Sequence, residues 1–213
     1  MKMAAAIFDL DGTLLDSMPI WQNLGANYLL QKKLQPAPGL QAVLKTLSLQ
    51  QAAQHFQAAY GLRETEETIV GEIATLIADS YRYEVQLKAG AAEYLQSLQE
   101  KNVKMGIATA TERDLAESAL ERLDIRQYFG TLLTTSEVGA GKDDPRIYQR
   151  ALEQLGTPLA QTIVFEDALY AIETATAAGF RVVGVHDEAA AADKERIKAL
   201  TEQYIYSFSD WKG

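Results

Sequence analysis

Short apolar runs recur along the chain, and most of them end abruptly at a polar residue. The first covers residues 4–8 and stops at Asp9. Runs of this length, bounded by charged or turn-forming residues, are typical of buried β-strands. The pattern predicts strands at residues 4–8, 103–108, 131–133, 162–165, 181–185 and 204–208.

Between these runs, apolar residues recur at the spacing of an amphipathic helix. Residues 115–123 and 147–155 show such a stripe, and Gly156 follows the second as an expected helix C-cap. Residues 168–178 predict a further helix that ends at Gly179. Strands that alternate with helices favour a parallel sheet covered on both faces.

The segment from residue 17 to residue 87 differs from the rest. It is rich in Ala, Leu and Gln, has almost no β-branched apolar run, and is broken at residues 36–39 and at Gly61. We predict helices here with no strand between them. The expected fold class is α/β, with a Rossmann-like parallel-sheet core of residues 1–16 and 88–213 and an inserted all-α cap of residues 17–87.

The composition excludes several kinds of chemistry. The chain has no Cys and only two His, which rules out thiolate nucleophiles and zinc–thiolate sites and disfavours a Ser-His-Asp site. A net charge of −9 argues against nucleic-acid partners and against an anionic membrane surface. The apolar start is too short for a signal peptide or a membrane span, so we expect a cytoplasmic protein, and by default a monomer.

Polar residues that can carry chemistry follow three of the predicted strands. They are Asp9, Asp11, Thr109, Glu166 and Asp167. Ligands of open parallel sheets bind beyond the carboxyl ends of the strands, so these side chains are expected to meet in one crevice. Crowded carboxylates need a cation, and oxygen ligands without His or Cys suit Mg²⁺.

Lys142 lies in a glycine-containing loop before a predicted helix and would add a second positive charge. The hydroxyl of Thr109 and the amides after it could bind phosphate oxygens, helped by the following helix N-terminus. A carboxylate nucleophile would divide a phosphoryl transfer into two easier steps, and a second acid could protonate the leaving oxygen. The residues therefore predict a Mg²⁺-dependent phosphoryl-transfer site.

Four motifs, in order, resemble those of the haloacid dehalogenase-like (HAD) superfamily. Residues 9–13 resemble its DxDGT motif, and Thr109 fits its second motif, a Ser or Thr after an apolar strand. Residues 141–148 are similar to GKPxPxxY, and residues 165–167 to FED. The helical insert resembles the cap of the phosphatase and β-phosphoglucomutase-like branch.

The resemblance implies a role for each site residue. Asp9 would be the nucleophile and a metal ligand. Asp11 would be the general acid/base, with its backbone carbonyl on Mg²⁺. Asp167 would ligate the metal, and Glu166 would hold a water on it. Phosphate would be bound by Thr109, Ala110 and Lys142. The substrate would be a small phosphorylated metabolite, and the cap would close over the site and exclude water.

The cap departs from the mutase pattern. Trp21 stands where mutase relatives carry a His, and Thr46 and Leu49 stand where they carry a Gly and an Arg that hold a second phosphate. Without that Arg a bisphosphate would lack its anchor, so hydrolysis is favoured. Two residues keep two interpretations each: Trp21 packs in the cap or contacts substrate, and Arg113 faces the ligand or the surface.

Three other functions are weighed against a phosphatase. A phosphomutase would use the same chemistry with a different acceptor. A dehalogenase is disfavoured, because that branch lacks an acid at the position of Asp11. A non-catalytic binding or regulatory protein on the same fold is disfavoured by the intact Asp9, Asp11, Lys142 and Asp167.

Overall fold

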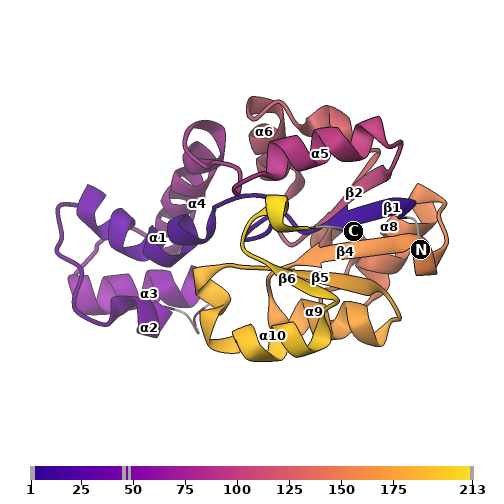
Figure 1. Cartoon of the computed structure of the whole chain (residues 1–213). Coiled ribbons are helices and arrows are strands. Elements are labelled where there is room, and N and C mark those ends of the chain that lie inside the picture. The colour runs from indigo at the N-terminus through magenta and orange to yellow at the C-terminus, as the bar shows by residue number, and fades with distance from the viewer. Residues whose placement is uncertain (1–2, 45–46, 48, 212–213) are drawn as a thin grey trace. The chain divides into compact units, whose positions relative to one another are not determined.

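The computed structural model describes residues 3–44, 47 and 49–211 (Figure 1). It divides the chain into two compact units. Residues 1–18 and 85–213 form one, called the core unit, and residues 19–84 form the other, called the helical unit.

The core unit is built on a six-stranded sheet whose neighbouring strands are all parallel. The strands are β1 (Ala5–Phe8), β2 (Lys104–Thr109), β3 (Thr131–Thr134), β4 (Thr162–Glu166), β5 (Arg181–Val185) and β6 (Gln203–Ile205). A strand therefore occurs at each predicted place, and the α/β Rossmann-like class is confirmed. The last prediction was too long, because Ser207 caps a short 3-10 helix over Phe208–Asp210.

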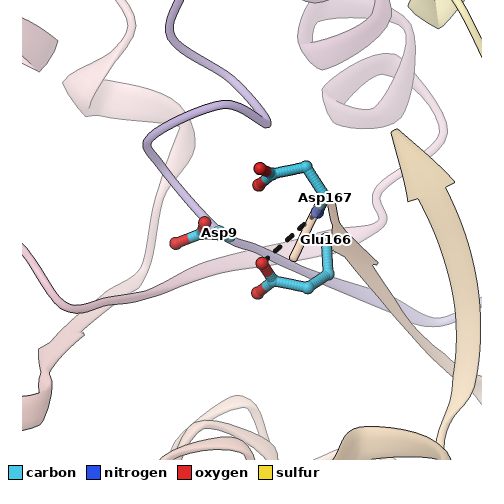
Figure 2. A group of neighbouring side chains, drawn as sticks. All are labelled: Asp9, Glu166 and Asp167. Carbon is cyan, nitrogen blue, oxygen red and sulfur yellow. Dashed lines mark hydrogen bonds between the residues drawn. The ribbon is translucent and has the colours of Figure 1, made fainter. Parts of the chain in front are cut away.

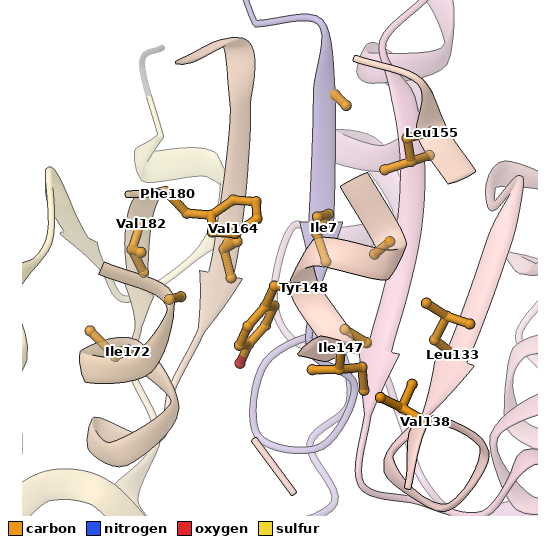
Figure 3. Close-up of a cluster of buried hydrophobic side chains, with 14 of the residues drawn as sticks. Ile7, Leu133, Val138, Ile147, Tyr148, Leu155, Val164, Ile172, Phe180 and Val182 are labelled. Atoms are coloured by element: carbon orange, nitrogen blue, oxygen red, sulfur yellow. The ribbon is translucent and has the colours of Figure 1, made fainter. Parts of the chain in front are cut away.

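Helices cover both faces of the sheet. In Figure 1, α5 (Ala91–Glu100) and α6 (Arg113–Arg122) lie on one side, and α8 (Arg146–Leu155), α9 (Leu169–Ala177) and α10 (Lys194–Leu200) lie on the other. Side chains alternate accordingly. Ile7 joins the cluster under α8 shown in Figure 3, while its neighbour Phe8 stacks on Phe165 on the opposite face, with ring centroids 4.8 Å apart. Gly156, at φ 60°, ends α8 as expected.

The helical unit contains α2 (Leu40–Leu44), α3 (Leu49–Tyr60), α4 (Glu66–Tyr83) and all of α1 (Met18–Gln31) but its first residue. Trp21 on α1 donates its indole N–H to the hydroxyl of the buried Tyr81, at 3.0 Å, and the side chain of Trp21 is partly exposed, so both interpretations of Trp21 remain. Leu49 is exposed, and Thr46 lies outside the described residues. Among the described residues, no helix combines the length and hydropathy needed to cross a membrane.

Two segments of the core unit flank the helical unit in the sequence, and they pair with each other. Leu15 and Leu87 form an antiparallel bridge. The amide of Asp16 donates to the carbonyl of Gln86 at 2.9 Å, and the amide of Lys88 donates to the carbonyl of Leu14 at 2.8 Å. The chain thus leaves the core unit and returns to it along one short two-stranded ribbon.

The strand order β3-β2-β1-β4-β5-β6 reverses direction between β1 and β4. From β1 the chain proceeds to β2 and β3 on one side, and β4 then begins the other half. Parallel sheets bind ligands in the crevice at such a switch point, because the connections diverge there. The fold therefore singles out the residues that follow β1 and β4.

Candidate active site

Three buried carboxyl groups meet where β1 and β4 end. Asp9, Glu166 and Asp167 each offer an oxygen atom within 4.8 Å of the others (Figure 2). Phe8 pairs with Phe165 in the sheet, and the amide of Asp9 donates to the carbonyl of Phe165 at 2.9 Å. The next residues on the two strands are therefore held side by side by the sheet itself.

Lys142 is the cation of this cluster. Its ammonium pairs with Asp9 Oδ1 and lies 2.8 Å from Glu166 Oε2, and the residue is only 4 % exposed. It follows α7 (Thr135–Val138), which ends at Gly139 with φ 71°, so the chain turns back toward the sheet before α8. When all three carboxyls are ionised, one ammonium leaves two negative charges uncompensated in a buried site.

The charges of the cluster favour the binding of a further cation. Burial raises the pKa of Asp9 well above its ordinary value, and the carboxylate of Glu166 adds to the rise. Burial and Glu166 raise the pKa of Asp167 to about 7. Burial lowers the pKa of Lys142, but the carboxylates of Asp9 and Glu166 raise it by more, so the pKa of Lys142 lies above its ordinary value. Carboxylate oxygens with two uncompensated charges fit a hard divalent cation.

Asp11 is held by hydroxyl groups on both sides. Ser17 donates to Asp11 Oδ1 at 2.6 Å, and the hydroxyl of Thr111 donates to Asp11 Oδ2. The amide of Thr111 in turn donates to Thr109 Oγ1 at 3.0 Å. The hydroxyl of Ser17 thus orients the carboxyl of Asp11.

The other sequence candidates divide into two groups. Thr109 is fully buried at the end of β2 and joins the Asp11 network, and Ala110 beside it is exposed. Arg113 does not join the cluster: its guanidinium binds Glu137, Glu117 and the carbonyl of Leu132.

Several contacts of the site were not foreseen from the sequence, and three of them involve residues that had been given no role. Thr13 donates to Asp167 Oδ1 at 2.9 Å, Tyr148 donates to Glu166 Oε2 at 3.1 Å, and Thr111 donates to Asp11. Thr13 and Tyr148 are the last residues of the first and third motifs, so motif position was the available signal. Thr111 follows the second motif by two residues and carries no such signal.

Gly12 allows the close approach of Asp167. Its φ is 79°, and a Cβ there would lie 2.5 Å from Asp167 Oδ2. We expect Gly12→Ala to displace this carboxylate and to weaken Mg²⁺ binding by about 10- to 100-fold, measured by titration calorimetry. Gly61→Ala is the matched control, because Gly61 has φ 70° but a Cβ there would meet no atom within 4 Å. Equal Mg²⁺ affinities in the two variants would contradict the prediction.

Comparison with known proteins identifies the family. The sequence profile described as haloacid dehalogenase-like hydrolase matches residues 6–185. The chain belongs to the haloacid dehalogenase-like hydrolases. It is therefore an enzyme of this family, and the four motifs fall on the site described above.

Relatives of this hydrolase are named as phosphatases. It is 33% identical over 208 residues to validoxylamine A 7′-phosphate phosphatase of Streptomyces hygroscopicus subsp. limoneus, covering 92% of this chain and 94% of that one. It is 28% identical to phosphorylated carbohydrates phosphatase of Thermotoga maritima, covering 86% and 85%. A crystal structure from Thermotoga maritima, provisionally named a β-phosphoglucomutase, matches with a TM-score of 0.83 at 24% identity, covering 95% and 94%, and shows the shared fold.

Proposed function

We propose that this hydrolase is a Mg²⁺-dependent phosphatase that cleaves a small phosphorylated metabolite through a phosphoryl group carried on Asp9. The observation that carries the proposal is the buried cluster of Asp9, Glu166 and Asp167, whose only cation among the described residues is Lys142. The two relatives compared above by sequence are both named as phosphatases of phosphorylated compounds, which supports the substrate class.

In the first step a carboxylate oxygen of Asp9 attacks phosphorus, and the bond from phosphorus to the leaving oxygen breaks. Asp11 gives that oxygen a proton. In the second step Asp11 takes a proton from water, the water oxygen attacks phosphorus, and the bond to Asp9 breaks, which releases inorganic phosphate. The hydroxyls of Ser17 and Thr111 hold the Asp11 carboxyl in place for both transfers.

Asp9, Asp167 and the backbone carbonyl of Asp11 would hold Mg²⁺, whose charge would offset the clustered carboxylates and the phosphate. The hydroxyl of Thr13 donates a hydrogen bond of 2.9 Å to Asp167 Oδ1 and so holds this carboxylate in position for the metal.

The phosphoryl oxygens need donors of their own. Lys142 supplies a positive charge, and the amide of Ala110 supplies a hydrogen bond. Thr109 Oγ1 accepts a hydrogen bond from the amide of Thr111. Thr109 would therefore donate its own hydroxyl proton to a phosphate oxygen.

Hydrolysis is favoured over transfer to a second sugar oxygen. Leu49 stands where mutase relatives bind a second phosphate, and its side chain cannot do so. Trp21 stands at the position of the mutase His, and its indole N–H is engaged by Tyr81. The use of residues 17–87 as a cap over the site, a monomeric state and a cytoplasmic location stay predictions.

A phosphate-release assay over many phosphorylated metabolites tests the function. We expect release from carbohydrate and polyol monophosphates with Mg²⁺, its loss with a chelator, and its return when Mg²⁺ is restored. Conversion of a sugar 1-phosphate to the 6-phosphate without free phosphate would show a mutase instead. No turnover of any phosphate ester by the Mg²⁺-loaded protein would indicate a binding protein.

A further inference from the structure

Tyr148 is a buried tyrosine whose hydroxyl makes one hydrogen bond within the part of the chain that the structure describes. Its ring packs in the apolar cluster of Figure 3, against Phe180 at a centroid distance of 6.1 Å, and the residue is 0 % exposed. Its hydroxyl donates to Glu166 Oε2 at 3.1 Å. A buried hydroxyl is costly unless it is hydrogen-bonded, and packing alone would be served by Phe. The hydroxyl therefore points to a role at Glu166.

The carboxylate of Glu166 accepts hydrogen bonds from protein donors on both of its oxygens. Oε2 accepts Lys142 at 2.8 Å and Tyr148 at 3.1 Å, and Oε1 accepts the amides of Asp167 and Ala168, each at 3.3 Å. An ionised carboxylate offers about four lone-pair sites. These contacts hold the carboxylate of Glu166 in place beside the ammonium of Lys142.

The two carboxylate partners of Lys142 behave differently during the reaction. On the proposed pathway Asp9 loses its negative charge when its oxygen bonds to phosphorus and regains it when water releases phosphate. Glu166 takes no part in these steps and keeps its charge. Lys142 can therefore move its second contact from Asp9 to a phosphoryl oxygen while Glu166 remains its fixed partner.

We propose that Tyr148 is a positioning residue, which fixes the carboxylate of Glu166 so that the ammonium of Lys142 stays directed at the transferring phosphoryl group. The inference rests on the proposed phosphatase function. The tyrosine hydroxyl and the lysine ammonium share one oxygen of Glu166, so the hydroxyl limits rotation of that carboxylate. Without it, Lys142 would sample orientations that reach the phosphoryl oxygens less well.

The test compares Tyr148→Phe with Ile147→Val on p-nitrophenyl phosphate at saturating Mg²⁺. Tyr148→Phe keeps the ring and removes only the hydroxyl. We expect its kcat to fall about tenfold, with KM and the Kd for Mg²⁺ each within about twofold of the parent. Ile147→Val trims the neighbouring buried residue, and we expect a lower Tm with an unchanged kcat. A kcat within twofold of the parent for Tyr148→Phe, or equal kcat losses in the two variants, overturns the proposal.

A second measurement needs no turnover. The metal-free parent, Tyr148→Phe, Glu166→Gln and the double variant are melted under the same conditions. If the hydroxyl acts through Glu166, the double variant loses less Tm than the two single variants together. Additive losses overturn the positioning role even if no substrate is cleaved. If the parent releases no phosphate, the proposed function is wrong. Non-additive losses of Tm in that case would still show that the hydroxyl of Tyr148 acts through Glu166.

Discussion

Asp9→Asn is expected to abolish phosphate release, by about 10⁴-fold or more in kcat. The amide oxygen of Asn is a poor nucleophile and cannot form the phosphorylated intermediate. The variant keeps the shape of Asp9, and Lys142 keeps its contact with Glu166 at 2.8 Å. The measurement is kcat on an aryl phosphate at saturating Mg²⁺, so that a lower affinity for Mg²⁺ does not affect the measured kcat.

The same variant has an expected effect on stability. Burial and the neighbouring Glu166 raise the pKa of Asp9, so its charged form is disfavoured in the folded state. A neutral Asn should therefore leave the metal-free protein at least as stable as the parent near pH 7, as judged from Tm. Asp114→Asn, the same change at an exposed site on α6, is the control and should keep full activity. Appreciable turnover by Asp9→Asn would remove Asp9 as the nucleophile.

Lys142→Met is expected to lower kcat/KM by about 10²- to 10³-fold, because a charge directed at the phosphoryl oxygens is lost. It should also destabilise the metal-free protein by about 3–5 kcal/mol, since the buried carboxylate of Glu166 is left without its cation. Thermal melts with and without Mg²⁺ measure this, and the rise in Tm on adding Mg²⁺ should exceed that of the parent.

Adding Glu166→Gln to Lys142→Met separates the two effects. Removing the anion along with the cation should restore much of the metal-free Tm, because no unpaired Glu166 charge remains. Activity should not return, because the ammonium is still missing. If the double variant recovered both, Lys142 would be a structural counter-ion and not a phosphate-binding group.

The strands were predictable because each is a short run of buried residues with a charged or turn-forming residue at its end. Strand ends then located Asp9, Glu166 and Asp167, since parallel strands place their carboxyl ends at one edge. The end of β6 was not predictable in this way. Tyr204 to Phe208 looks like a strand locally, but Ser207 and Asp210 form a capping box that turns the chain.

The connections among site residues depend on tertiary structure, and the sequence carries little sign of them. Thr111 reaches Asp11 from a loop 100 positions away. Arg113, four residues after Thr109, was open to either interpretation, and its guanidinium binds Glu137 and Glu117 and not the site. The division of Lys142 between Asp9 and Glu166, and the hydroxyl of Tyr148 on the second of them, follow only from the packing of α8 on the sheet.

The ribbon formed by residues 14–16 and 86–88 has a consequence for how this protein can change. Directly opposed residues in such a pair, here Leu15 and Leu87, have Cα atoms about 5 Å apart, so the inserted segment begins and ends at nearly one point. A turn of a few residues could span that gap. The whole insertion could be exchanged as a cassette, longer or shorter, without opening the sheet that holds Asp9 against Asp167. On the prediction that residues 17–87 cap the site and select the substrate, one such exchange would change the substrate and leave the reaction unchanged.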